Sequence, residues 1–304
     1  MIDNITLYKY FLMAINTGSL SKVAREMYVT QPAVSNAIQQ LEDALGVKLF
    51  FRTSRGITPT PEGELLREYV RSAMSYLESG EDKLRDIAGL RGGVMRVGAS
   101  DMTLKFYLLD HLEHFKKEYP GVRLSVTNNP TPSTLELLRS GKIDFCVVSE
   151  PVGEDETIRF IPVRTICDIA VASPEIAGRL SPDGRPIPFS RFAGETLVML
   201  ERGTSSRISI ERHFRRFSAP EEMLSPSIEL AQSDLVMEFA MRGMGIAFVV
   251  ADFAREALEQ GRLVELPLEH PFPRRSFLLA YLNKLPLSSA SRRFIEMLGV
   301  ADDL

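Results

Sequence analysis

Apolar residues recur at helical spacing through the first sixty positions of the chain. In Ile5–Thr17 they fall on one face of a predicted helix, and Gly18 is expected to end it in the left-handed conformation. A second short helix is predicted over Ser21–Tyr28. A third begins with Gln31 and Pro32, because proline is tolerated in the first turn of a helix. The pattern therefore predicts three short helices in succession.

The third helix, which Thr30 can cap and Gly46 can end, has two unlike faces. Its apolar stripe consists of Val34, Ile38, Leu41 and Leu45, and its polar face consists of Pro32, Ser35, Asn36, Gln39 and Asp43. A helix that enters the major groove of DNA needs such a polar face, with hydrogen-bonding side chains that reach base edges. Two short helices joined by a tight turn, with this helix as the second, form the pattern of a helix-turn-helix.

Residues 48–58 suggest two short strands around a turn, a wing that would carry Lys48, Arg52 and Arg55. Basic side chains on a wing are suited to contact DNA phosphates. The pattern alone also suits a small three-helix bundle whose polar face only meets solvent, and it does not decide between the two interpretations.

Residues 61–89 are predicted to form one long helix, since no further helix breaker follows Gly63 until Gly80. At 1.5 Å per residue such a helix would be about 43 Å long. Its apolar residues share one face: Leu65, Tyr69, Ala73, Tyr76, Leu77, Leu84, Ile87 and Ala88. A stripe on so long a helix needs a partner, which could be the C-terminal part of the same chain. Gly92 and Gly93 then predict a hinge.

Strand-like and helix-like segments alternate from residue 92 to the end of the chain. The order strand, helix, strand, helix, strand predicts a parallel sheet with helices on both faces, an α/β fold, and a second unit of the same kind follows. The predicted strands are 94–99, 123–127, 143–148, 168–172, 196–200, 246–250 and 277–282, and the predicted helices are 104–119, 133–140, 206–217, 233–241 and 288–298.

Three predicted loops lead from the end of a strand into a helix and carry hydroxyl side chains. In open sheets of this kind ligands bind at the carboxyl ends of strands, where helix N-termini offer unpaired N–H groups to a carboxylate or phosphate. These loops predict four effector-binding residues: Ser100, Thr131, Thr204 and Ser205. Arg202 or Arg207 is expected to pair with the anionic group of the effector. Serine and threonine at these positions often serve only as N-caps, and Asp101 would compete with an anionic ligand.

Length and composition agree with a globular chain of about two domains. The 304 residues are 44% apolar and 25% charged, and two cysteines, Cys146 and Cys167, are too few for a disulfide framework or a structural zinc site. No signal peptide or membrane-spanning run is recognisable, so a cytoplasmic protein without a membrane partner is expected. The net charge is −4; residues 1–62 hold six Lys/Arg against five Asp/Glu, and the rest thirty against thirty-five. This small asymmetry does not decide whether nucleic acid is a partner.

Other chemical patterns are weak. Residues 242–247 contain glycines at the spacing of a dinucleotide site, but they lie between a helix and the following strand, the reverse of the order such a site needs. His111 and His114 could share one helix face, yet no third metal ligand is evident. No nucleophile, base and orienting group combine into a catalytic site. We therefore expect no metal, no cofactor and no enzymatic activity.

The stretch from Phe11 to Gly63, with the dense run TQPAVSNAIQQLEDALGVKLFFR, closely resembles the N-terminal winged helix-turn-helix of LysR-type transcriptional regulators. The rest of the chain is similar to that family in length and layout. The resemblance implies a regulator that binds an interrupted-palindrome operator and a small effector, and that self-associates as a dimer or tetramer. It also favours an antiparallel dimer as the role of the long helix.

The resemblance also implies DNA contacts. It places Gln31, Pro32 and Ser35 on the recognition helix, Thr30 at its start beside a phosphate, and Arg52 and Arg55 on the wing against the DNA backbone. Relatives often carry basic residues where this chain has Asn36, Gln39 and Gln40. Because amides read adenine edges but neutralise no phosphate, Asn36 and Gln39 are expected to contribute base contacts.

Three parts follow from the resemblance: a winged helix-turn-helix at 1–60, a linker helix with a hinge at 61–91, and a periplasmic-binding-protein-like effector domain at 92–304. The chain would cross between two subdomains near 161–164 and 266–271, so that 92–161 and 271–304 form one subdomain and 162–270 the other. The alternative is a metabolite-binding or enzymatic two-subdomain protein whose N-terminal helices only mediate association. Residues 19–58 match a DNA-reading unit, and such a unit would have no function in a protein of that kind.

Overall fold

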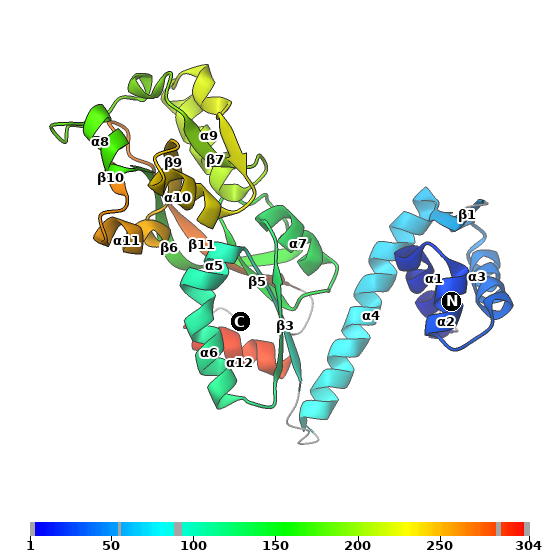
Figure 1. The fold of residues 1–304 in the computed structure, drawn as a ribbon. Coiled ribbons are helices and arrows are strands. Elements are labelled where there is room, and N and C mark those ends of the chain that lie inside the picture. The colour runs from blue at the N-terminus through cyan, green and yellow to red at the C-terminus, as the bar shows by residue number, and fades with distance from the viewer. Residues whose placement is uncertain (1–3, 54–55, 88–92, 284–286, 301–304) are drawn as a thin grey trace. The chain divides into compact units, whose positions relative to one another are not determined.

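The computed structural model describes residues 4–53, 56–87, 93–283 and 287–300 (Figure 1). Contacts within the chain divide it into two compact units, residues 1–84 and 85–304. We describe each unit by itself.

The first unit opens with three short helices and a hairpin. The helices are α1 (Ile5–Thr17), α2 (Leu20–Glu26) and α3 (Gln31–Leu45), and strands β1 (Phe50–Thr53) and β2 (Gly56–Pro59) pair antiparallel. The bounds of α1 and α3 agree with those predicted. The second helix ends before the predicted Tyr28, because Tyr28 takes a left-handed backbone (φ 55°) in the turn that leads to α3.

The core of this unit forms where the three helices meet the wing and the following helix. Its buried residues include Phe11 from α1, Val23 from α2, Ile38 and Leu41 from α3, Phe50 from β1 and Val70 from α4 (Pro61–Ile87). The predicted stripe of α3 is buried except at its last member: Leu45 is 40% exposed, because it lies in the final turn of the helix, beyond this cluster. That part of the prediction was wrong.

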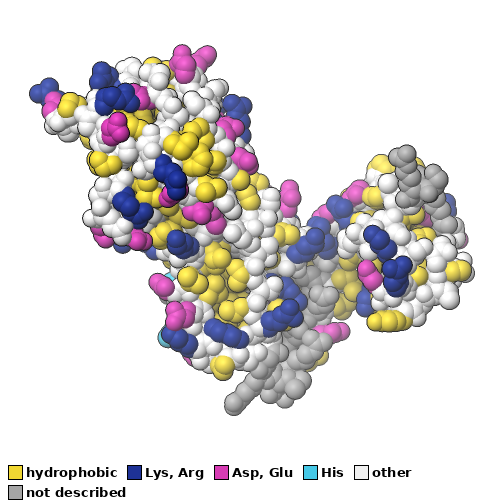
Figure 2. All heavy atoms as spheres, in the orientation of Figure 1, with side chains coloured by type: hydrophobic (Ala, Val, Ile, Leu, Met, Phe, Trp, Pro, Cys, Tyr) yellow, Lys and Arg dark blue, Asp and Glu magenta, His cyan; other side chains and the backbone are white. Residues whose placement is uncertain are grey.

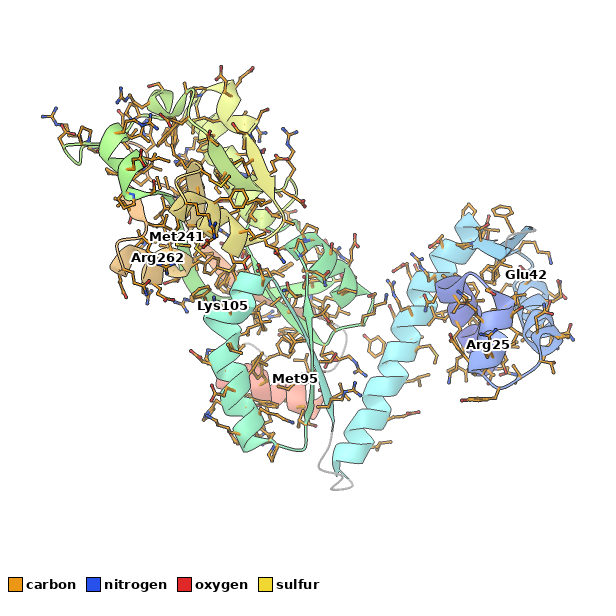
Figure 3. All side chains as sticks on the ribbon, in the orientation of Figure 1. Arg25, Glu42, Met95, Lys105, Met241 and Arg262 are labelled. Carbon is orange, nitrogen blue, oxygen red and sulfur yellow. The ribbon has the colours of Figure 1, made fainter. Side chains whose placement is uncertain are left out.

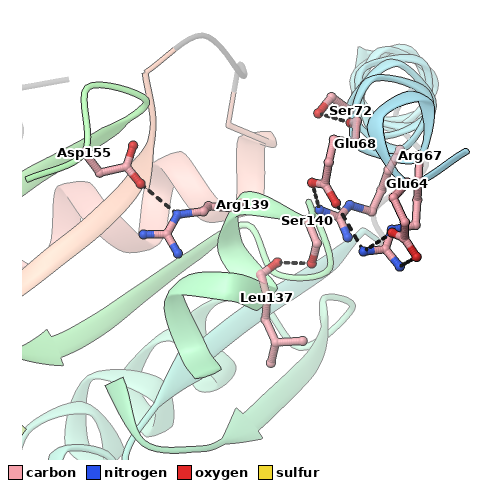
Figure 4. A network of polar contacts seen from close by, with 9 residues as sticks. Glu64, Arg67, Glu68, Ser72, Leu137, Arg139, Ser140 and Asp155 are labelled. Atoms are coloured by element: carbon pink, nitrogen blue, oxygen red, sulfur yellow. Dashed lines mark hydrogen bonds and ion pairs between the residues drawn. The ribbon is translucent and has the colours of Figure 1, made fainter. Parts of the chain in front are cut away.

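Helix α4 contains 27 residues, which corresponds to about 40 Å. Arg67 lies 3.5 Å from the adjacent Glu68, and both are labelled in Figure 4. Charged side chains one turn apart also pair along the helix: Arg67 lies 2.9 Å from Glu64, and Arg71 pairs with Glu68. Each such pair on a helix surface contributes about 0.2–0.5 kcal/mol to helix stability. Local charge pairing therefore supports a helix that has only part of its length packed on the core of its own unit.

The second unit is built on a sheet whose nine described strands pair in the order β4-β3-β5-β11-β6-β9-β7-β8, with β10 beside β6. The bounds are β3 (Val94–Ala99), β4 (Arg123–Asn128), β5 (Phe145–Ser149), β6 (Ile158–Ala172), β7 (Leu197–Leu200), β8 (Ile228–Leu230), β9 (Ile246–Val250), β10 (Val264–Leu266) and β11 (Arg274–Leu282). Strand β3 is parallel to β4 and β5, and β7 is parallel to β8 and β9, as the alternating pattern predicted. The central strands β6 and β11 run antiparallel to their neighbours, which the pattern did not predict.

Helices cover both faces of each half of the sheet. Their bounds are α5 (Asp101–Thr103), α6 (Leu109–Glu118), α7 (Thr131–Arg139), α8 (Pro174–Leu180), α9 (Ser205–Arg216), α10 (Ser233–Met241), α11 (Ala251–Glu259) and α12 (Ser289–Met297), and a π-helical turn at Leu104–Leu108 joins α5 to α6. In the first half α6 and α12 lie side by side on one face and α7 covers the other (Figure 1). In the second half α8 and α9 pack on one face, α10 and α11 on the other.

The two halves are joined by β6 and β11. Strand β6 pairs with β11 as far as Cys167 and with β9 from Asp168 onward, so one continuous strand passes from the first half into the second. The chain returns just before Arg274, where β11 begins. Both crossings lie a few residues later than we expected, because a long strand rather than a loop makes the first one.

Among the helices that the structure describes, none is both long enough and apolar enough to cross a membrane.

Candidate functional sites

The outer face of α3 presents polar side chains to solvent. Gln31, Pro32 and Asn36 are exposed and Ser35 is partly exposed, while Val34 and Ile38 on the opposite face are buried. Thr30 is the N-cap of α3, and its hydroxyl oxygen accepts a hydrogen bond from the N–H of Ala33 at 3.4 Å. Within the described part of the chain Gln31 and Asn36 make no side-chain hydrogen bond. Their amides are therefore available to another molecule.

Gln39, also expected to contact bases, forms hydrogen bonds with other residues of its own unit. Its Nε2 donates to Asp43 Oδ1 at 2.6 Å, and its Oε1 accepts from Lys48 Nζ at 3.3 Å. A base contact by Gln39 would have to replace these bonds. The structure therefore places Gln39 at the junction between α3 and the wing, apart from the available amides of Gln31 and Asn36.

Of the three basic residues expected on the wing, Lys48 is described in full. Its ammonium lies 2.8 Å from Glu42 Oε2, and its side chain is 63% exposed. The backbone of Arg52 belongs to β1. The side chain of Arg52 and the whole of Arg55 lie outside the described residues.

Glu42, which our sequence analysis did not single out, lies on α3 (Figure 3) and binds the backbone at the start of the wing. It is 4% exposed, and its Oε1 accepts from the backbone N–H of Leu49 at 2.8 Å and of Phe50 at 3.3 Å. Burial alone raises the pKa of Glu42, but the hydrogen bonds from Lys48, Leu49 and Phe50 together outweigh burial and hold it below its ordinary value. Glu42 and Lys48 lie six residues apart, so neither helical nor strand periodicity reveals the contact.

The second unit contains a cavity of about 250 Å³ at the carboxyl ends of its parallel strands. All four predicted effector residues line it: Ser100, Thr131, Thr204 and Ser205. Helices α7, α9 and α10 begin at this cavity, with Thr131, Ser205 and Ser233 in its wall. The structure thus gathers loops that lie more than a hundred positions apart in the sequence.

Most of these hydroxyls already have partners. Ser100 caps α5 by accepting from Thr103 N–H at 3.4 Å, and Thr204 caps α9 by accepting from Arg207 N–H at 3.3 Å. Ser205 donates to the carbonyl oxygen of Pro151 at 3.4 Å. The capping role considered from sequence therefore applies to Ser100 and Thr204, and each retains lone-pair capacity for a ligand. Thr131, 8% exposed, makes no side-chain hydrogen bond with another described residue.

Neither arginine expected as a charge partner lines the cavity. Arg207 is 1% exposed and is enclosed by Glu211 at 2.7 Å and the carbonyl oxygens of Leu200 and Leu224 at 3.0 and 3.1 Å. Arg202 donates to the same Leu224 oxygen at 3.4 Å. That expectation was wrong, because the guanidinium of Arg207 uses its hydrogen bonds on buried acceptors inside its own half of the sheet. No Lys or Arg is among the described residues of the cavity wall, whereas Asp101 is.

Several residues of the wall escaped our sequence analysis as candidates. Asn128 and Asn129 supply amides, and Phe253 supplies an apolar surface. Gln232 and Ser233 follow β8, a strand of three residues that was not predicted, so the fourth strand-to-helix loop went unnoticed. A strand this short leaves too few residues for an alternating pattern to be recognised.

A buried ion pair lies beside this cavity. Arg275 Nε and Nη2 each lie 2.7 Å from an oxygen of Asp168, and Nη2 also donates to Ser206 Oγ at 2.9 Å. Arg275 Nη1 donates to the carbonyl oxygen of Glu150 at 2.9 Å. The two charges are neutralised by each other, and Ser206 joins them to the cavity wall. The partners are too far apart in the chain for their pairing to be predicted.

Within the described residues, no group of three or more His, Cys, Asp or Glu side chains could hold a metal ion.

Comparisons with known proteins cover both units. Residues 5–64 match the family described as "Bacterial regulatory helix-turn-helix protein, lysR family", and residues 88–301 match "LysR substrate binding domain". The RuBisCO operon transcriptional regulator of Allochromatium vinosum is 28% identical over 286 residues, which are 92% of this chain and 90% of that protein. These matches confirm the predicted family.

Solved structures of the same family share the fold. CbnR, in complex with its target DNA, superposes with a TM-score of 0.64 at 18% identity, over 98% of this chain and 99% of that one. LysG from Corynebacterium glutamicum, with bound effector Arg, gives 0.66 at 18% identity, over 99% and 98%. The predicted combination of an N-terminal helix-turn-helix and a C-terminal α/β effector domain is confirmed.

Proposed function

The chain belongs to the lysR family of bacterial regulatory helix-turn-helix proteins, and from that premise we propose how its parts divide the work of a ligand-responsive, DNA-binding transcriptional regulator. Residues 1–60 bind operator DNA, 61–91 link and pair two copies, and 92–304 respond to an effector, with two subdomains between which the chain crosses at Cys167–Asp168 and just before Arg274. Since the relatives are transcriptional regulators, the cavity serves binding rather than catalysis. Because the operator DNA is chromosomal, we place the protein in the cytoplasm.

The observation that carries the DNA-binding proposal is the polar outer face of α3. Gln31 and Asn36 present exposed amides there, and a bidentate amide-to-adenine pair contributes about 1–3 kcal/mol of discrimination between bases. Thr30, Pro32 and Ser35 would position the helix start, while Arg52 and Arg55 would supply phosphate contacts. Specificity would thus come from α3 and salt-dependent affinity from the wing.

The test is a gel-shift assay with DNA upstream of the protein's own gene, repeated over a range of salt concentrations. Gln31→Ala and Asn36→Ala should lose discrimination among operator variants with little change in the salt dependence of binding. Asn16→Ala, which removes an exposed amide on α1, is the matched control and should behave as the parent does. If both α3 variants discriminate among operators as the parent does, α3 does not read bases through these amides. Absent or salt-independent binding would favour the alternative of a metabolite-binding protein.

For the effector we propose a small molecule that carries a carboxylate and also a cationic group. The N–H groups at the starts of α7, α9 and α10 can receive the carboxylate, aided by the positive ends of these helices. Asp101 in the wall, with no Lys or Arg among its described lining residues, favours a ligand that brings its own cation. A water molecule takes about 30 Å³ in the liquid, so the cavity of about 250 Å³ suits a ligand of roughly eight non-hydrogen atoms.

A thermal-shift screen of the full chain tests this class of ligand. Amino acids should raise the melting temperature more than carboxylic acids of the same size that lack the amine. In Asp101→Asn this preference should disappear, while Asp110→Asn, a change on the neighbouring helix outside the cavity, should keep it. Equal stabilisation of the parent by amine-free acids would exclude the role of Asp101, and no stabilisation by either class would exclude the carboxylate.

Self-association is proposed to use α4. One face of this helix packs on the core of the first unit through Leu66, Val70 and Met74. Five members of the stripe predicted from sequence are nevertheless 39–69% exposed: Leu65, Tyr69, Tyr76, Leu77 and Leu84. Apolar side chains aligned over so many turns favour a second helix as their cover, which supports a dimer through α4 as the building block of a tetramer.

A further inference from the structure

A second cavity in the effector unit is lined by arginines rather than hydroxyl groups. Its volume is about 330 Å³, and its wall comes from α9, the start of β11 and the segment after β5. Arg212 and Arg216 belong to α9, Arg274 and Arg275 to β11, and Glu150 is the one carboxylate among its described lining residues. The effector cavity, by contrast, has no basic side chain in its described wall.

Three of these four guanidinium groups have no counter-charge among the residues that the structure describes. Arg275 is paired with Asp168, as described above. Arg212, Arg216 and Arg274 are exposed, and within the described residues none of them forms an ion pair or hydrogen bond. The neighbouring basic residues of α9 differ, because Arg207 and Arg215 share the carboxylate of Glu211.

The arrangement is not explained by helix stability. Cations in the last turn of a helix interact favourably with its C-terminus, which accounts for Arg216 in α9. Arg212 lies one turn earlier on the same face, where two like charges repel each other, and Arg274 comes from a strand. Glu150 offsets only part of this charge, and its Oε2 accepts from the N–H of Ser276 at 2.6 Å.

We propose that this cavity is a second ligand site, which binds a small dianion of the phosphate monoester class. Guanidinium groups bind phosphate oxygens in pairs of parallel hydrogen bonds, and their fixed charge does not depend on pH in the working range. Three unpaired arginines against one carboxylate match the charge of a dianion, whereas a monocarboxylate would leave an excess of positive charge. Ser209, in the same wall one turn before Arg212, adds a hydroxyl donor.

The site is connected to the effector cavity through Arg275. This residue lines the arginine cavity, and its Nη2 bonds to Ser206 Oγ, which lines the effector cavity. A dianion that joins Arg212 on α9 to Arg274 on β11 would also bridge the two halves of the sheet beside their crossing. Occupation of either cavity should therefore change the affinity of the other by the same factor. This coupling rests on the proposed effector function, but the dianion site itself does not.

Calorimetric titration of the full chain with inorganic phosphate, at ionic strength held constant with chloride, tests the site. The parent should bind phosphate, and Arg212→Gln and Arg274→Gln should each weaken binding at least tenfold, since each removes charge-assisted hydrogen bonds. Arg215→Gln, in the last turn of the same helix but outside the cavity and paired with Glu211, should bind as the parent does. Acetate, a monoanion, should bind more weakly than phosphate.

Three results would overturn the proposal: no phosphate binding above the chloride background, an equal loss in Arg215→Gln, or acetate binding as tight as phosphate. Gel-shift assays and melting curves on the same variants keep the outcomes separate. Retained DNA binding without phosphate binding rejects the arginine site alone, whereas phosphate binding without DNA binding rejects the regulator function and leaves the site standing.

Discussion

Replacing Glu42 by alanine is expected to release the wing from α3. The carboxylate of Glu42 accepts from two backbone N–H groups, those of Leu49 and Phe50, and from the ammonium of Lys48. Leu49 and Phe50 are 1% and 6% exposed, so water cannot replace the lost acceptor without local opening. The variant therefore leaves two buried donors unsatisfied.

The magnitude follows from those contacts. A buried donor without an acceptor costs about 1–3 kcal/mol, and the partly exposed pair with Lys48 adds about 0–1 kcal/mol. We expect Glu42→Ala to lower the local free energy of opening by about 2–7 kcal/mol, the sum of two unsatisfied donors and the lost ion pair. Glu42→Gln keeps one carbonyl acceptor and should cost about 1–2 kcal/mol.

Hydrogen exchange of the full chain measures this directly. A loss of 2 kcal/mol corresponds to about thirtyfold faster exchange at the amides of Leu49 and Phe50. Glu26→Ala, an exposed glutamate at the end of α2, is the control and should leave these rates unchanged. If Glu42→Ala exchanges at the parent's rate in residues 46–60, Glu42 does not hold the wing.

The same group predicts a dependence on pH. The pKa of Glu42 is lowered in the folded chain, so the unfolded chain binds more protons between that lowered pKa and the ordinary value of 4.5. The contribution of Glu42 is then complete above the ordinary value and is lost as the pH falls through the lowered one. Exchange at Leu49 and Phe50, corrected for intrinsic rates, should show this acid step in the parent but not in Glu42→Gln.

Three further perturbations test the packing and the assembly. In Gly63→Ala the new Cβ would lie 2.3 Å from the carbonyl oxygen of Leu49, so a fall in melting temperature of the first unit is expected, and an unchanged temperature would contradict the close approach. In Tyr28→Asn the left-handed backbone (φ 55°) becomes easier to adopt, and since Tyr28 is 97% exposed no packing is lost; a gain of up to about 1 kcal/mol should appear in denaturant unfolding, and a loss would show that the ring contributes to stability. In the double variant Tyr69→Glu, Leu77→Glu, sedimentation should show a smaller species than the parent, and an unchanged oligomer would exclude α4 as the dimer face.

Local signals in the sequence were sufficient for many individual elements. The bounds of α1, α3 and α10 and of β3 and β9 agree with those predicted. Capping residues, glycines at helix ends and apolar periodicity act between residues a few positions apart, so they can be recognised without knowing the fold. The same is true of the hydroxyl-bearing loops, because their position after a strand and before a helix is itself a local property.

Other features depended on which distant segments meet. The antiparallel course of β6 and β11, the burial of Arg207 and the ion pair between Asp168 and Arg275 have no local signature. A charged side chain is exposed, paired or buried according to the surfaces that pack around it, and its own sequence neighbours do not determine them. For that reason Arg207 could not be recognised as an interior residue from its position beside Thr204.

The sequence by itself determined the family, many of the helices and strands, and three of the four strand-to-helix loops from which the effector cavity is made. Only the tertiary structure decided which polar residues remain available to a ligand. Glu42 and Gln39 are bound to the wing, whereas three arginines from α9 and β11 line one cavity without an ion pair to any described residue. The physical reason is that hydrogen bonds and ion pairs are shared among groups brought together by packing. Helix and strand patterns are set by the chain's nearest residues, whereas the balance of charge in a cavity exists only after those elements have come together.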